Sequence, residues 1–274
     1  MKPAPDSDPA PDLDPAPAAI RSLGGFFALH TSRPVPPRPL PTLADAYAPG
    51  DDEHPGPNPR PRLAKDPLAF RVRKVAAALR VPETRVAASV AQQGLAARLW
   101  SVTLGCAALH GHVPDLAPPL LHWDPDATAP DDLWLEEVRP LPGDAGTVAD
   151  VVLHTHLAPL TVAVHARYRV ATGLLWGNAA SALAGAGREL HRWARRNGRT
   201  DTADRARDLT AGLLAHPLLA GTGTLTGTAF RRRSCCLYYR VPGAGVCGDC
   251  CFSRPPEPPR SSSPPHPSPG APSG

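Results

Sequence analysis

The sequence has few aromatic residues and almost no excess charge. Phe, Trp and Tyr make up 5% of its 274 residues, and 29 Lys and Arg against 25 Asp and Glu leave a net charge of +4. A nucleic-acid-binding surface needs clustered basic residues with aromatic stacking partners. The one dense basic run is Arg231-Arg232-Arg233. The composition therefore argues against a nucleic-acid partner.

Long, strongly apolar runs are also scarce. Two long stretches without formal charge, Val170–Gly187 and Leu209–Phe230, are interrupted by Gly, Asn, Ser, Thr or Pro, whereas a membrane-crossing helix needs about 20 predominantly apolar residues. The first 20 residues have no apolar core of the kind a secretory signal requires. We expect no membrane span and a cytoplasmic protein, in which thiols stay reduced.

Proline is abundant but concentrated at the two ends. Of 37 prolines, 16 lie in residues 1–61 and nine in 252–274, which leaves 12 (37 − 16 − 9) for the region between. Segments rich in Pro, Ser or Asp bury too little apolar surface to fold. The predicted organisation is a disordered segment 1–18, a mainly helical domain 19–229 that includes a Pro-rich connector 33–62, a cysteine-rich segment 230–252 and a disordered tail 253–274.

The apolar pattern of the middle region is mostly helical. Apolar residues recur every three or four positions over several long windows, and shorter apolar runs bounded by turn residues indicate strands. We predict an α+β fold that is predominantly α-helical with a small antiparallel sheet. The predicted helices span about 63–80, 83–110, 147–196 with breaks, and 202–216, with a helical turn at 42–48; the predicted strands lie within 23–31, 120–123 and 132–138, and GTGTLTG at 221–227 is interpreted as a linker.

Five of the six cysteines fall within 17 residues, in FRRRSCCLYYRVPGAGVCGDCCF at 230–252. Their spacing is C-C-x10-C-x2-C, and a fifth cysteine follows directly. The glycines of VPGAG can fold the segment back on itself, so that four thiolates surround one centre. Four cysteines form the ligand shell of structural zinc and of many iron–sulfur clusters. The predicted ligands are Cys235, Cys236, Cys247 and Cys250, whereas the isolated Cys106 is predicted to be a buried packing residue.

The adjacent pair Cys235-Cys236 helps to choose between these metals. Neighbouring side chains leave the backbone in diverging directions, which fits one small tetrahedral ion poorly and a two-iron centre better. The residues alone therefore favour a [2Fe–2S] cluster and leave zinc as the alternative. The basic residues Arg231, Arg232, Arg233 and Arg240 flank the cysteines and can balance a negative cluster, hold an anionic ligand, or form a solvated face.

At these cysteines the sequence resembles the FhuF-type ferric-siderophore reductases, whose C-terminal [2Fe–2S] motif has the same C-C-x10-C-x2-C spacing. Weaker similarities are LGGFFALH at 23–30, HLAPL at 156–160 and LWGNAASAL at 175–183. The resemblance implies cytoplasmic one-electron reduction of Fe(III) held by a siderophore, of the hydroxamate type, with a [2Fe–2S] cluster as electron carrier. Cys251 departs from the family, in which proline is frequent at this position. It is either a spare thiol or a competitor of Cys250.

Outside the cysteines the candidate substrate contacts are His156, Asn178, Arg233 and Arg240. The sequence has no phosphate loop, nucleophile elbow or flavin fingerprint. We therefore expect the electrons to come from another protein, a ferredoxin or a flavoprotein. The alternative function is a structural four-cysteine zinc module in a binding protein without redox chemistry. Kinship with siderophore-synthesising ligases is disfavoured, because no nucleotide-binding motif is recognisable.

Overall fold

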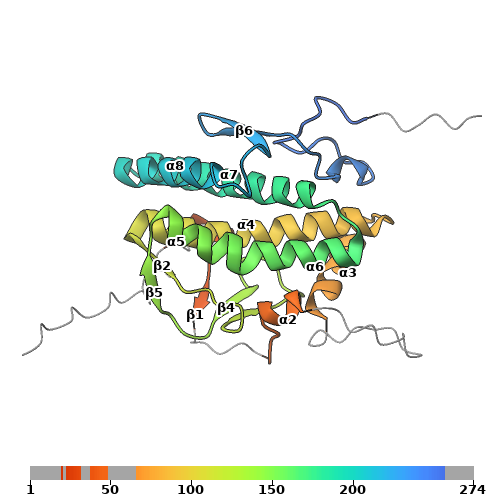
Figure 1. Cartoon of the computed structure of the whole chain (residues 1–274), viewed down its shortest axis with the longest axis horizontal. Helices are drawn as coiled ribbons and strands as arrows, with labels where there is room; N and C mark the ends of the chain where they lie inside the picture. The colour runs from red at the N-terminus through yellow and green to blue at the C-terminus, as the bar shows by residue number, and fades with distance from the viewer. Residues whose placement is uncertain (1–19, 21–22, 32–37, 49–65, 257–274) are drawn as a thin grey trace, which may run out of the picture.

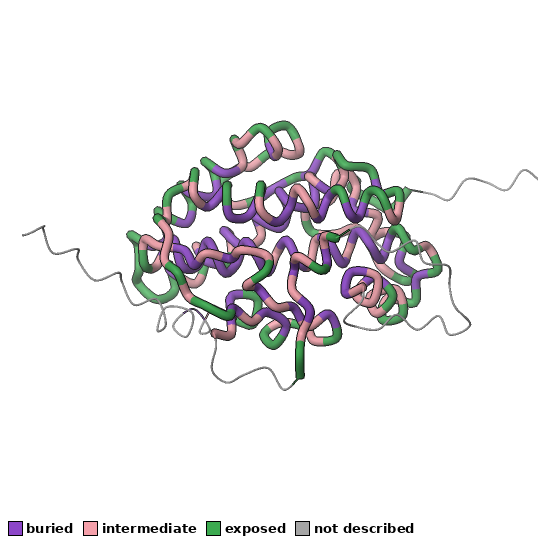
Figure 2. The backbone as a smooth tube through the Cα atoms, turned by 60° about the horizontal axis from the view of Figure 1, so that its bottom comes forward, coloured by how far each residue is buried: buried purple, intermediate pink, exposed green. Residues whose placement is uncertain are grey.

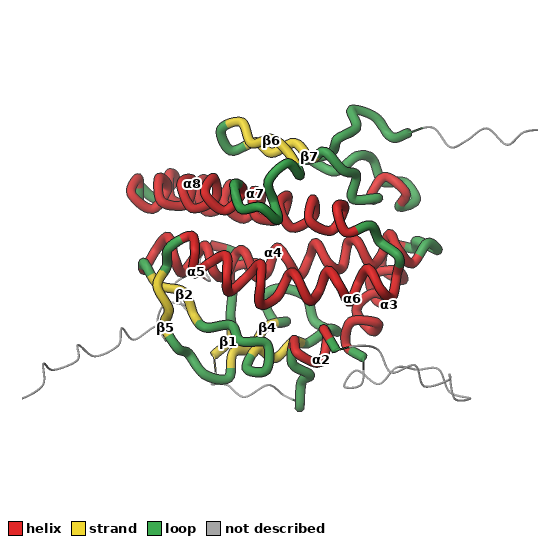
Figure 3. The backbone as a smooth tube through the Cα atoms, viewed as in Figure 1, coloured by secondary structure: helices red, strands yellow, loops and turns green. Residues whose placement is uncertain are grey.

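The structure is a computed structural model that describes residues 20, 23–31, 38–48 and 66–256. The segment 1–18, most of the connector 33–62 and the tail from residue 257 onward lie outside the described residues, so the predictions of disorder made for them are not tested. Helices predominate in the described part and small sheets accompany them, which confirms the predicted α+β class (Figure 3).

The long helix α4 (Thr84–His110) lies at the centre of the fold, between the layer of α7 and α8 and the layer of α5 and α6 (Figure 1). Its small side chains allow neighbours to approach from several sides, and most of its residues are buried. Trp100 is fully buried and donates a hydrogen bond from Nε1 to the Ala179 carbonyl, 3.1 Å away. The helix ends at Gly111, whose φ of 74° suits glycine. The prediction of a helix over 83–110 is confirmed.

Helices α7 (Thr172–Arg196) and α8 (Thr200–Leu214) pack side by side above α4. A Cβ placed on Gly187 of α7 would lie 2.1 Å from Thr210 Oγ1 and 3.1 Å from Thr210 Cβ. The close approach of the two helices therefore requires glycine at this position. Helix α8 begins at Thr200 after the cap residue Arg199, two residues earlier than the predicted start at about 202.

The other helices cover the opposite side of α4. A capping box of Thr42 and Asp45 starts the short α2, and the Asp66 carboxylate accepts from the Ala69 amide to start α3. These helices are α2 (Leu43–Tyr47), α3 (Pro67–Leu79), α5 (Ala145–Ala149), the π-helical segment η3 (Asp150–Leu157) and α6 (Ala158–Tyr168). The predicted turn at 42–48 and the broken helix over 147–196 are confirmed.

One helical stretch, Ala145–Tyr168, has the length and apolar composition needed to cross a membrane. The sequence analysis did not single out this run. In the structure 61% of its most apolar window is buried, and the stretch packs against α4. The core helix of a folded domain can have the same length and apolar composition as a membrane span.

The strands are short and form three small sheets. The strands predicted within 120–123 and 132–138 are confirmed, and they pair antiparallel as β3 and β4 with Leu121 opposite Leu135. The predicted strand over 23–31 is strand only at its end, since Gly25–Phe27 forms a 3-10 turn, η2. The sheets are β1 (His30–Thr31) beside β4 (Leu133–Leu135) and β3 (Leu121–Trp123), β2 (His112–Pro114) with β5 (Pro140–Pro142), and β6 (Gly223–Thr226) with β7 (Ala229–Arg232).

The interpretation of 221–227 as a linker was wrong, because this segment contains β6. A Cβ on Gly223 would lie 2.2 Å from Phe230 Cζ and 2.6 Å from the Arg231 carbonyl oxygen. Glycine is present here because the two strands approach closely, and it does not mark a flexible linker. The β6–β7 hairpin lies on the α7 side of the bundle, and the other two sheets lie on the far side (Figure 1).

Buried residues follow the inner faces of the helices, and exposed residues follow their outer faces and the loops (Figure 2). One ion pair lies within this core. Arg98 of α4 donates from Nε to the Asp132 carboxylate at 2.7 Å, and the two side chains are 2% and 5% exposed. The other guanidinium nitrogens of Arg98 donate to the carbonyls of Phe26 and Ala28. Arg98 therefore fixes the N-terminal segment and the loop before β4 against α4.

Candidate metal centre

The β6–β7 hairpin leads the chain directly into the first two cysteines. Where the chain leaves β7 it crosses α7 at Gly177, where an added Cβ would lie 2.4 Å from Ser234 Oγ. The Ser89 hydroxyl of α4 donates to the Cys236 carbonyl at 2.8 Å. Two central helices thus position the Cys235-Cys236 pair.

The second half of the segment folds back on β7. The Arg232 amide donates to the Asp249 carbonyl at 3.0 Å, and the Cys250 amide donates to the Cys247 carbonyl at 3.1 Å, which closes the C-x2-C turn. The Asp249 carboxylate accepts from the Ser181 hydroxyl at 2.7 Å and lies 3.6 Å from Arg188 Nη1. The CGDC turn is therefore fixed to α7 through Asp249.

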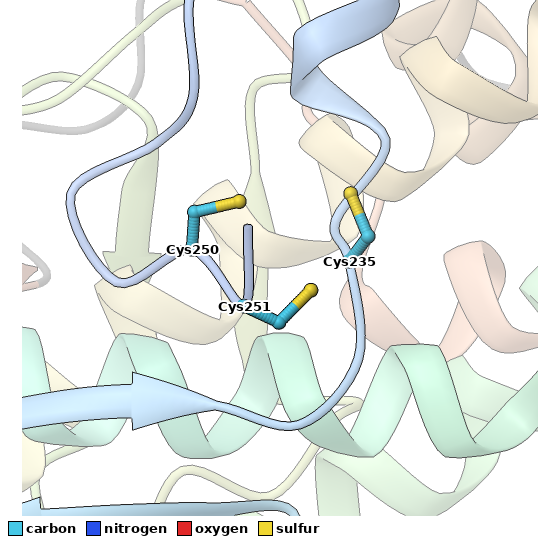
Figure 4. A group of neighbouring side chains, drawn as sticks. All are labelled: Cys235, Cys250 and Cys251. Atoms are coloured by element: carbon cyan, nitrogen blue, oxygen red, sulfur yellow. The ribbon is translucent and has the colours of Figure 1, made fainter. Parts of the chain in front are cut away.

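The five cysteine sulfurs converge as a pair and a triplet. Cys236 Sγ and Cys247 Sγ lie 3.4 Å apart. The sulfurs of Cys235, Cys250 and Cys251 all lie within 4.8 Å of one another, and Figure 4 shows them directed toward a common space. The four predicted ligands are thus distributed over both groups, and the structure adds Cys251 to the triplet.

Two backbone amides donate to these sulfurs. The Leu237 amide lies 3.3 Å from Cys235 Sγ, and the Phe252 amide lies 3.4 Å from Cys250 Sγ. The sequence carries no signal for these donors, because backbone amides are present at every residue except proline and only the local fold directs these two at sulfur. Such bonds stabilise a thiolate and tune a cluster bound to it.

The thiols differ in acidity because their surroundings differ. The hydrogen bond between Cys236 and Cys247 lowers the pKa of Cys236 to about 6 and raises the pKa of Cys247. Burial raises the pKa of Cys235 to about 11 and also raises the pKa of Cys251. Cys106, fully buried in α4, has its pKa raised to about 12 by burial. Its placement confirms the prediction of a buried packing residue.

Arg232 is a buried basic residue beside the cysteines. It is 2% exposed, donates from Nη2 to Asn178 Oδ1, and lies 3.5 Å from Gln93 Oε1. Within the described part of the chain no carboxylate forms an ion pair with it, and its Nε has no hydrogen-bond partner. Its charge lowers the pKa of Cys236. A buried cation of this kind requires an anion nearby.

The sequence alone does not distinguish the three consecutive arginines Arg231, Arg232 and Arg233, although their environments differ because β7 ends at Arg232. Side chains alternate between the two faces of β7, so that Phe230 and Arg232 are buried and Arg231 is exposed. Recognising β7 in the sequence would have identified Arg232 as the inward residue. No sequence signal identifies Ser89 or Asp249, because their roles depend on tertiary contacts.

The predicted substrate contacts fall in different places. His156 is fully buried, with Nδ1 2.8 Å from the Tyr47 hydroxyl and Nε2 2.6 Å from the Leu116 carbonyl oxygen. Its partner helix α2 lies on the far side of the bundle from the β6–β7 hairpin (Figure 1). The ring has no free surface to offer a ligand, so the structure does not bring His156 to the cysteines.

Asn178 is also fully buried, and its amide nitrogen lies 3.0 Å from the Ser89 carbonyl oxygen and from Gln92 Oε1. Its Oδ1 accepts a hydrogen bond from Arg232, and the side chain has no exposed surface for a substrate. Arg233 is exposed beside the hairpin. Arg240 is exposed and pairs with Glu83 at 2.8 Å.

The residues fit an iron–sulfur cluster in chemistry as well as in spacing. All the converging donors are thiols, the ligands preferred by iron–sulfur clusters. Two buried donors beside them, Arg232 Nε and Ser234 Oγ, have no partner among the described residues, and a negatively charged cluster with sulfide acceptors would satisfy such groups. The fold and the site define a mainly helical domain followed by a segment that gathers five cysteines.

The comparison with protein families agrees with this description. Residues 232–252 match the model of the FhuF 2Fe-2S C-terminal domain, and the match covers this domain alone. The FhuF-like resemblance and the [2Fe–2S] cofactor expected from the sequence are thereby confirmed. No curated protein matches the chain.

Proposed function

We propose that the protein is a cytoplasmic ferric-siderophore reductase, which reduces chelated Fe(III) by one electron through a [2Fe–2S] cluster and releases Fe(II). The observation that carries the proposal is the gathering of five cysteines in a segment that matches the FhuF 2Fe-2S C-terminal domain, as one pair of sulfurs 3.4 Å apart and one triplet within 4.8 Å. The proposed cluster ligands are Cys235, Cys236, Cys247 and Cys250. Fe(III) is a hard ion that oxygen chelators bind tightly, and Fe(II) is bound far more weakly. One-electron reduction is therefore sufficient to release the metal.

Four residues would hold the cluster, and others would set its surroundings. When bound, the cluster supplies one electron at a time. Arg232 would place a buried positive charge beside the thiolates, where it favours the state with more negative charge. The amides of Leu237 and Phe252 would stabilise sulfur in the same sense. The exposed Arg231, Arg233 and Arg240 offer a basic surface to an acidic electron-donor protein, a ferredoxin or a flavoprotein.

The proposal is tested by reoxidation of the reduced protein. The protein, reduced anaerobically with dithionite and freed of excess reductant, is mixed with a ferric trihydroxamate in the presence of a coloured Fe(II) chelator. The expected result is one Fe(II) trapped per electron delivered, with return of the oxidised absorbance. A reduced protein whose absorbance is unchanged by the ferric chelate, while oxygen reoxidises it, would contradict the proposed function.

The zinc alternative has its own outcome. A colourless protein with one zinc and no acid-labile sulfide would favour a structural module in a binding protein. In that case Cys235→Ser would lower the stability of the fold, and no electron transfer would be lost.

A further inference from the structure

A cavity of about 360 Å³ lies beside the cysteine segment. Its walls come from the N-terminal segment around Phe26, from α4 at Ala97 and Ser101, and from α7 at Ser181 and Gly185. None of these residues is among the four candidate substrate contacts predicted from the sequence. Most of them are small or apolar, with a few hydroxyl and amide groups among them, a composition typical of small-molecule sites.

One wall of the cavity belongs to the centre itself. Asp249 lines the cavity and stands between Cys247 and Cys250 in the CGDC turn. Its carboxylate is held by the Ser181 hydroxyl and approached by Arg188 Nη1, and both of these residues also line the cavity. A molecule seated in the cavity can therefore contact Asp249, which is the residue directly before Cys250 and two residues after Cys247.

The groups around the cavity limit what it can hold. Two ion pairs balance the charges here: Arg188 lies 3.6 Å from Asp249, and Glu189, which also lines the cavity, pairs with Arg192 at 2.6 Å. The apolar wall contains the half-exposed ring of Phe26. This environment disfavours a highly charged anion such as a nucleotide. It favours a ligand of low net charge, with an apolar backbone and oxygen atoms that accept hydrogen bonds from Ser101 or Arg188.

We propose that this cavity seats one arm of a ferric hydroxamate chelate, so that the chelated iron lies next to the CGDC turn. The placement rests on the proposed function, because the centre beside the cavity supplies the electron. Three hydroxamates neutralise the charge of Fe(III), and their linking chains are largely apolar. The volume is smaller than such a chelate, which therefore enters with one arm and keeps the rest in solvent.

Gly185 provides a substitution that fills the cavity without disturbing the fold. A Cβ at this position meets only Arg188 Nη2, at 4.0 Å, and a residue other than glycine stabilises the interior of a helix. Gly185→Leu would therefore fold and occupy the cavity. Gly173→Leu is the matched control, because Gly173 lies on the same helix, is exposed, has no atom within 4 Å of an added Cβ and does not line the cavity.

Binding is measured by isothermal titration calorimetry with a gallium(III) trihydroxamate, a redox-inert analogue of the ferric chelate, added to the oxidised, cluster-loaded protein. Gly185→Leu is expected to raise Kd at least tenfold, and Gly173→Leu to leave it unchanged. Ala97→Phe, which enters the cavity from α4, is expected to weaken binding in the same way. The visible spectrum of each variant shows whether the cluster is retained.

The outcomes separate this proposal from the proposed function. Unchanged binding in both Gly185→Leu and Ala97→Phe would overturn the placement of the chelate. Absence of gallium binding by the unmodified protein, together with reoxidation by the ferric chelate, would also overturn the placement and leave the reductase function intact. If the ferric chelate neither binds nor reoxidises the protein, the proposed function fails first, and the placement fails with it.

Discussion

The ion pair between Arg98 and Asp132 joins three separate parts of the fold and can be tested by one isosteric substitution. Asp132→Asn preserves the shape of the side chain and removes its charge. The Arg98 guanidinium then remains 2% exposed with no carboxylate partner. Its remaining acceptors are the amide oxygen of the new asparagine and the backbone carbonyls of Phe26 and Ala28, and none of these neutralises a cation.

Removing one partner of a buried ion pair costs about 3–5 kcal/mol, because the other charge stays buried. The pair is at the buried extreme, and asparagine can still accept from Arg98, so we expect a loss near 3 kcal/mol. In a domain of this size 1 kcal/mol shifts Tm by about 2–4 °C. The predicted decrease in Tm for Asp132→Asn is therefore roughly 6–12 °C.

The assay is thermal unfolding followed by circular dichroism, under anaerobic conditions and at one scan rate for all variants. Glu137→Gln is the control, since Glu137 forms its 2.6 Å ion pair with Arg139 at an exposed surface, and its Tm is expected to be unchanged. The double variant Arg98→Met, Asp132→Leu, which leaves no charge buried, should recover part of the loss. A decrease below 2 °C for Asp132→Asn would refute the reasoning.

Three further predictions concern other parts of the molecule. Burial lowers the pKa of His156 to about 4, against about 6.5 when unfolded, so its contribution is full above pH 6.5 and is lost as pH falls toward 4. In urea titrations the unfolding free energy should drop by about 2 kcal/mol more between pH 7 and pH 5 than in His156→Gln. Gly187→Ala places a methyl against Thr210 and should cost about 1–3 kcal/mol, whereas Gly185→Ala should cost nothing in the same titration. Arg232→Met should lower the reduction potential of the cluster in spectroelectrochemistry by tens of millivolts, where about 59 mV is tenfold for a one-electron couple, and an unchanged potential would show that the charge of Arg232 is not coupled to the centre.

The helices could be predicted because their signals are local. The start of α3 depends on Asp66 and Pro67, and the end of α4 depends on Gly111, so neighbouring residues determine where each helix begins and ends. The β6 strand was missed because Gly223 reflects a contact with β7, which no local pattern reveals. The helices depend on local sequence and could be predicted, whereas β6 depends on a tertiary contact and could not.

For the metal centre, too, the part determined by local sequence could be predicted and the part determined by tertiary contacts could not. The spacing of four cysteines indicates a metal-binding segment, because all the expected ligands lie within one short stretch of chain. The surroundings of the centre are not local. Ser89, Ser181 and Asp249 acquire their roles from contacts between α4, α7 and the CGDC turn, and the similarity that suggested His156 as a substrate contact belongs to a core position.

The binding of a [2Fe–2S] cluster by Cys235, Cys236, Cys247 and Cys250 is tested most directly by iron and acid-labile sulfide analysis of the anaerobically purified protein. The visible spectrum is recorded as well, for the unmodified chain and for single Cys→Ser variants. We predict two irons and two sulfides per chain, lost in Cys236→Ser and retained in Cys251→Ser and in the buried control Cys106→Ser. One zinc without sulfide, or a cluster that survives in Cys236→Ser, would contradict the account.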